Sequence, residues 1–183
     1  MSSPTSTLAR PSADTPAPHA ATPHAYDVGL LVLRVVLGLT MAAHGSQKLF
    51  GWFGGGGLDG TGQFFTMSGY PSGKTLALVA GMTETFGGLA LAIGLLTPLA
   101  GAAVVGTMVN AIVVKGTGSF FAPTGMEYEL VLAAGAAALT LTGPGRIAVD
   151  RFLPGVKDHR LAYGTASVAL GLVVAGITLL LRK

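Results

Sequence analysis

The chain has 183 residues, of which 50% are hydrophobic and only 10% are charged, and its mean hydropathy is +0.63. Soluble domains carry about 25% charged residues, so this composition excludes a compact protein whose whole surface faces water. The 11 Lys and Arg residues are scattered between apolar runs, which argues against a nucleic-acid-binding patch. The absence of Cys excludes disulfides and thiolate metal ligands.

The N-terminal segment, residues 1–25, is rich in Ser, Thr, Pro and Ala. Such a segment has too little apolar surface to compensate for the entropy lost on ordering, so we expect a disordered tail. A membrane domain is then expected over residues 26–155. Residues 156–183 complete a charged loop and add a further C-terminal transmembrane helix.

The rest of the chain is divided into apolar runs. A spanning helix needs about 20 residues, and the third and fourth runs are short for that length. The sequence predicts an all-α, polytopic transmembrane helical bundle with four core helices and a fifth at the C-terminus. Thr97 and Pro98 separate the second and third runs, which predicts a tight turn between adjacent antiparallel helices. The five runs are residues 28–43, 75–96, 99–114, 128–142 and 161–181.

The order of the runs assigns the connections to two membrane faces. We name face A the side of the N-terminus, the 97–98 turn and residues 143–160. Face B is the side of residues 45–74 and 115–127, and nine of the 13 aromatic residues fall there when Tyr128, directly after the second range, is included. This asymmetry leaves two interpretations open, an interfacial aromatic belt or loops that fold back over a cavity.

Three polar residues interrupt the apolar runs at similar depths. Arg34 lies about 9 Å below face A and Glu84 about 14 Å from face B, in a hydrocarbon core of about 30 Å. We therefore expect Arg34 and Glu84 to pair, with Asn110 nearby. Ionisable groups inside a membrane are costly and usually face the protein interior. This centre could bind a ligand head group or relay a proton, or it could be an ion pair that fixes helix register.

A second polar set lies at face B and consists of His44, Gln47, Lys48, Glu127 and Glu129. The spacing of four places His44 and Lys48 on one side of the first helix. The set could form a His/Lys/Glu cluster for a ligand. Alternatively, Lys48 extends to the membrane surface and the carboxylates favour a helix N-terminus. A single helical His is insufficient for a haem held by two histidines, and we predict no metal site.

Several motifs make the chain similar to the DoxX family of small bacterial membrane proteins. They are the first helix with Arg34, the run 44–51 (His-Gly-Ser-Gln-Lys-Leu-Phe-Gly), the run 84–91 beginning with Glu84, and 143–146 (Gly-Pro-Gly-Arg) followed by Asp150. The resemblance covers residues 28–152. It implies a four-helix core and a plasma-membrane protein connected with respiratory or quinone-dependent oxidoreductases and oxidative stress.

This resemblance, with the residues above, suggests an accessory subunit that supports a membrane-associated or quinone-linked oxidoreductase. The alternatives are a small carrier or channel that uses Arg34, Glu84 and Asn110, or a purely structural membrane protein. Whether the chain is itself an enzyme stays open. We expect no intrinsic cofactor, a membrane quinone as the candidate ligand, and the bilayer, an oxidoreductase and a second copy of the chain as partners. The expected location is the bacterial plasma membrane, with a cytoplasmic N-terminus.

Overall fold

The structure is a computed structural model and describes residues 23–183. The predicted disordered tail, residues 1–25, therefore lies almost entirely outside the described residues. Within them the chain is all α-helical, with no strand, which confirms the predicted fold class. The elements are α1 (Pro23–Phe50), η1 (Trp52–Gly54), α2 (Gly57–Met67), α3 (Gly73–Ile93), α4 (Thr97–Lys115), α5 (Glu127–Thr142), η2 (Val149–Phe152) and α6 (Leu161–Leu180).

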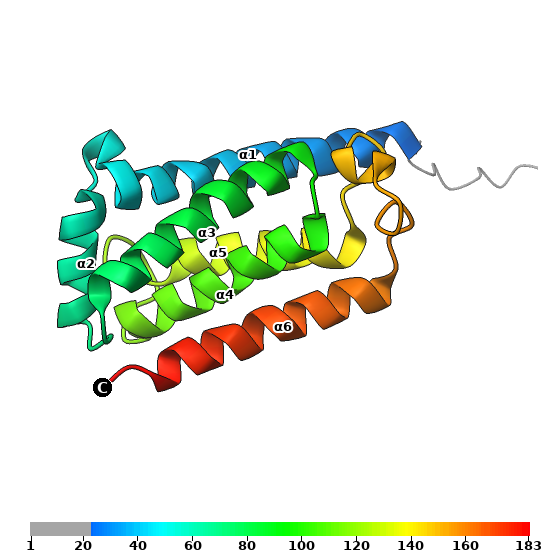
Figure 1. Ribbon diagram of the computed structural model, residues 1–183. Helices are drawn as coiled ribbons and strands as arrows, with labels where there is room; N and C mark the ends of the chain where they lie inside the picture. Colours follow the sequence, from blue (N-terminus) through cyan, green and yellow to red (C-terminus); the bar gives the residue numbers. More distant parts are fainter. Residues whose placement is uncertain (1–22) are drawn as a thin grey trace, which may run out of the picture.

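Five helices run along the length of the bundle, and α2 lies across one end of it (Figure 1). α1, α3, α4 and α6 are long and apolar enough to cross a membrane. α5 packs against α4 and has 16 residues, so it rises about 24 Å, less than a typical hydrocarbon core. The predicted polytopic bundle is confirmed, with a C-terminal helix packed against α4 and α5.

The turn between α3 and α4 lies slightly earlier than expected. Gly94 ends α3 with a φ of +71°, and Leu96 has a φ of +47°. Thr97 and Pro98 already belong to the first turn of α4. Proline is well tolerated there because its missing N–H would have no partner within the helix. The predicted adjacency of the two antiparallel helices is confirmed.

Small residues allow the helices to approach closely. A Cβ atom added to Gly38 of α1 would lie 2.4 Å from the carbonyl oxygen of Gly88 on α3. The reciprocal addition at Gly88 would lie 2.5 Å from the carbonyl oxygen of Gly38. Between α4 and α6, a Cβ on Gly171 would lie 2.4 Å from the carbonyl oxygen of Ala102. In lipid, close van der Waals packing of this kind drives helix association.

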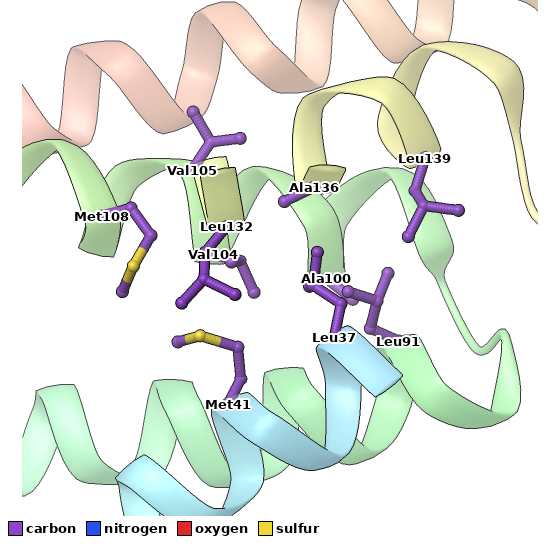
Figure 2. Packing of buried hydrophobic residues seen from close by; sticks show 10 residues of the cluster. All are labelled: Leu37, Met41, Leu91, Ala100, Val104, Val105, Met108, Leu132, Ala136 and Leu139. Carbon is purple, nitrogen blue, oxygen red and sulfur yellow. The ribbon is translucent and has the colours of Figure 1, made fainter. Parts of the chain in front are cut away.

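The hydrophobic core joins α1 and α3 to α4 and α5. Met41, Leu91, Ala136 and Leu139 are each 0% exposed. Figure 2 shows side chains of α1 facing those of α4 and α5 across this core. The core occupies the middle of the bundle. The cluster consists of Leu37, Met41, Leu91, Ala100, Val104, Val105, Met108, Leu132, Ala136 and Leu139.

Candidate functional site

A buried ion pair joins α1 to α3 towards face B. Lys48 Nζ lies 2.6 Å from Glu84 Oε2, and the side chains are 24% and 2% exposed respectively. The two helices approach closely here, because Gly45 has no side chain. A Cβ atom added to Gly45 would lie only 2.4 Å from the backbone nitrogen of Thr85. Glu84 therefore takes its cation from the end of α1. The predicted pairing of Arg34 with Glu84 is wrong.

Arg34 instead serves the face A end of the bundle. Its side chain is fully buried, and Nη2 donates a hydrogen bond to the carbonyl oxygen of Ile147. The guanidinium lies under the α3–α4 turn, next to Gly94. Gly94 is ten residues beyond Glu84, and these positions are about 15 Å apart along α3. The Arg34 guanidinium is therefore too far from Glu84 along the helix axis for the two side chains to pair.

Asp150, in η2, completes the face A end. Its carboxylate oxygens accept hydrogen bonds from the backbone nitrogens of Leu96 at 2.5 Å and Thr97 at 2.9 Å. These are N–H groups at the start of α4, which have no partner within the helix. Its own backbone nitrogen donates to the carbonyl oxygen of Gly94 at 2.8 Å. The loop of residues 143–160 is thereby fixed to the α3–α4 turn.

His44 lies one turn before Lys48 and connects α1 to α5. Its Nε2 is 2.9 Å from the hydroxyl oxygen of Tyr128, and the two ring centroids are 5.7 Å apart. His44 precedes Gly45, which packs against Thr85, the residue after Glu84. The structure thus brings His44, Lys48 and Glu84 together, with Tyr128 as a fourth member. We call these four residues the polar centre.

A cavity of about 530 Å³ adjoins the polar centre at face B. On one side of it, Lys115 Nζ is 2.9 Å from Glu129 Oε1. Glu127 Oε1 accepts a hydrogen bond of 2.8 Å from the backbone nitrogen of Ala122 and so holds the 115–127 loop against α5. Since Tyr128 also lines the cavity, its side chain connects the cavity to the polar centre. The lining residues are Lys115, Ala122, Pro123, Glu127, Tyr128 and Val131.

Asn110 and Gln47 lie elsewhere and make structural contacts. Asn110 Oδ1, on α4, accepts hydrogen bonds of 3.0 Å from the hydroxyl of Tyr70 in the α2–α3 turn and from that of Thr178 on α6. Burial raises the pKa of Tyr70, which keeps its hydroxyl protonated as a donor. Gln47 Nε2 donates to the carbonyl oxygen of Phe53 at 3.3 Å and supports η1. The expected proximity of Asn110 to an Arg34–Glu84 pair is therefore wrong.

The sequence predicted three of the four residues of the polar centre but assigned them to different sets: Glu84 to the intramembrane set, and His44 and Lys48 to the face B set. It missed Tyr128, which lies between the predicted carboxylates Glu127 and Glu129, and Lys115, which directly follows the third apolar run. A phenol or an amine at the end of an apolar run is common at membrane interfaces, so neither residue stood out. In residues 23–183, no group of three or more His, Asp or Glu side chains could hold a metal ion.

This fold and site define the class as a multi-pass α-helical membrane protein with a polar centre near one face. The DoxX family model matches residues 29–117, which carry Arg34, Glu84 and Asn110. A protein of Bacillus subtilis (strain 168) named "Putative oxidoreductase CatD" is 33% identical over 129 residues, covering 70% of this chain and 89% of the relative. The chain belongs to the DoxX family, as the resemblance predicted. No solved structure matches it.

Proposed function

We propose that this chain is an accessory membrane subunit that supports a membrane-associated, quinone-linked oxidoreductase. The observation that carries the proposal is an open surface cavity beside the polar centre, in which Glu84 is buried and Tyr128 is exposed at the cavity wall. A lipid-soluble molecule with a polar ring would partition to this depth, with its tail among the acyl chains. The name of the Bacillus relative, "Putative oxidoreductase CatD", supports the same association.

The chemistry of the cavity suits a quinone head group. Quinone carbonyl oxygens accept hydrogen bonds, and the cavity wall carries the Lys115 ammonium and the Tyr128 hydroxyl, whose proton is available to a quinone when His44 Nε2–H donates to the phenol oxygen. Pro123 and Val131 supply apolar surface for a ring. The cavity volume of about 530 Å³ is sufficient for a ring, and the cavity is open on its outer side.

The polar centre would then position Tyr128. The hydrogen bond between His44 and Tyr128 fixes the phenol at the cavity wall. The Lys48–Glu84 pair lies one helical turn from His44 and contributes to the electrostatic potential at its ring. In this proposal the redox chemistry belongs to the partner oxidoreductase and its quinone.

The alternative of a carrier or channel receives less support. It required Arg34, Glu84 and Asn110 to form one centre. Arg34 instead lies under the α3–α4 turn, Glu84 pairs with Lys48, and Asn110 bonds to Tyr70 and Thr178.

We further propose that the protein resides in the bacterial plasma membrane with face A in the cytoplasm. Supporting this orientation, Arg146, Arg151, Lys157 and Arg160 are concentrated in one short loop. Short cytoplasmic loops carry an excess of Lys and Arg. Reporter fusions at the two termini should report opposite sides, with the N-terminus inside. An external N-terminus would reverse the orientation.

The functional proposal is tested by purifying the full chain in a mild detergent and analysing co-purifying proteins and extracted quinone by mass spectrometry. Tyr128→Phe and His44→Gln should each lower the quinone recovered per protein molecule. Tyr163→Phe is the matched control, because it removes a tyrosine hydroxyl near face A. Equal quinone in all variants, or none in the parent chain, would remove the case for the site.

A further inference from the structure

α2 is the helix that the sequence did not predict, and its orientation differs from that of the others. It lies across the end of the bundle (Figure 1). Because α1, α3, α4 and α6 run along the bundle and can cross a membrane, a helix across their ends lies near the membrane plane, at the depth of lipid head groups. Phe64 is 49% exposed and Met67 is 80% exposed on this helix, so both can enter the acyl-chain region.

Cationic side chains gather around the turn that follows α2. Arg182 Nε donates a hydrogen bond of 2.6 Å to the carbonyl oxygen of Ser68. The backbone nitrogen of Lys183 donates to the carbonyl oxygen of Gly69 at 2.9 Å, which places both cations beside the turn. These carbonyl groups carry no net charge, so the two contacts do not themselves neutralise the Arg182 and Lys183 side chains.

One carboxylate reduces the positive charge of this surface. Lys74 Nζ lies 2.6 Å from Asp59 Oδ1, and both side chains are mostly exposed. Residues 50–74 and 181–183 together contain three cationic side chains and one acidic side chain, a net side-chain charge of +2. A positive surface at head-group depth attracts anionic lipids.

A hollow of about 590 Å³ lies beside Lys74. Its hydrogen-bond donors include the Lys74 ammonium and the Gln63 amide, while Met67 supplies an apolar edge. The hollow thus combines donors suited to phosphate oxygens with a side chain suited to acyl carbons. It is lined by Asp59, Gly62, Gln63, Thr66, Met67 and Lys74.

We propose that the surface formed by α2, the α2–α3 turn and the C-terminal end of α6 binds the head group of an anionic phospholipid. The net positive charge favours an anionic lipid over a zwitterionic one. The exposed Phe64 and Met67 favour a lipid over a free phosphate ion, because they lie where acyl chains begin. The site is separate from the cavity at Tyr128, so it does not depend on the proposed quinone function.

The test uses the full chain in detergent, with native mass spectrometry to count bound phosphatidylglycerol. The double substitution Arg182→Gln/Lys183→Gln should weaken apparent binding by about 25-fold, or about fivefold for each charge removed near the lipid surface. Arg182→Lys keeps the charge and should retain most of the binding. The matched control is Arg151→Gln/Lys157→Gln, which removes two charges from face A.

Because Arg182→Gln also removes the contact with Ser68, Lys74→Gln/Lys183→Gln provides a second variant that keeps this contact. It should also lose most of the preference for phosphatidylglycerol. Unchanged binding in both double variants, or an equal loss in the face A control, would overturn the proposal. So would equal binding of phosphatidylethanolamine, or complete competition by inorganic phosphate.

Discussion

The Lys48–Glu84 pair allows a quantitative test of how this bundle tolerates charge. Glu84 is 2% exposed and Lys48 is 24% exposed. Removing one partner from a buried ion pair costs about 3–5 kcal/mol, whereas replacing both with apolar residues is often nearly neutral. Lys48→Leu leaves a carboxylate with no route to water, so we expect a cost of about 3 kcal/mol.

The reciprocal substitution should cost less. Glu84→Leu leaves the Lys48 ammonium, whose flexible stem can extend towards face B and water, so we expect about 1–2 kcal/mol. The double substitution should recover most of both losses. The expected order of stability is therefore parent, double variant, Glu84→Leu and then Lys48→Leu.

Thermal unfolding in detergent would measure these differences. A change of 1 kcal/mol shifts the Tm of a chain of this size by about 2–4 °C, so Lys48→Leu should lower it by about 6–12 °C. The exposed Asp59–Lys74 pair is the matched control, and the same cycle there should give a coupling below about 1 kcal/mol. No coupling between Lys48 and Glu84, or a coupling no larger than the control, would refute the argument.

Three further predictions concern the helix contacts. Gly88→Val should lower the Tm by several degrees, because its Cβ would lie 2.5 Å from the carbonyl oxygen of Gly38. Gly29→Ala is the control: Gly29 has open space around it, so the Tm should change little, and equal effects of the two substitutions would contradict the packing. Asp150→Asn should lower the free energy of unfolding by about 1–3 kcal/mol, measured by thermal unfolding, because it removes a carboxylate that accepts two backbone N–H bonds. An unchanged stability would show that the start of α4 does not depend on this carboxylate. Asn110→Leu should increase amide hydrogen exchange at the α6 C-terminal end, measured by mass spectrometry, and unchanged exchange would count against its bridging role.

The apolar runs predicted the long helices well, because a lipid-exposed segment must satisfy its own backbone hydrogen bonds. The same reasoning missed α2, whose sequence contains Gly57, Gly60 and Gly62. Glycine disfavours helix by about 1 kcal/mol per residue. Tertiary contact compensates here: Gly62 packs against the backbone of Lys74, where a Cβ would lie 2.9 Å from its Cα.

The candidate site was less predictable, because depth along a helix does not specify direction around it. The depths of Arg34 and Glu84 estimated from the sequence were compatible, but the Arg34 guanidinium lies beside Gly94, about 15 Å along α3 from Glu84, and contacts the carbonyl oxygen of Ile147. Lys48 was predicted to belong to a face B cluster, and its side chain instead reaches inward to Glu84. Both outcomes depend on helix rotation and on loop positions, and neither leaves a periodic signal in the sequence.

The contact between Asp150 and the start of α4 also bears on the order of assembly during synthesis. The acceptor lies more than 50 positions after the N–H groups that it satisfies. During synthesis, α3 and α4 are complete before Asp150 has been added to the chain. The α3–α4 hairpin therefore enters the membrane while the N–H groups at the start of α4 face water or the insertion machinery. The bundle can close at face A only after α5 has emerged. A nascent chain that stalls before residue 150 therefore presents unsatisfied backbone donors, a feature by which quality control could distinguish unfinished chains from finished ones.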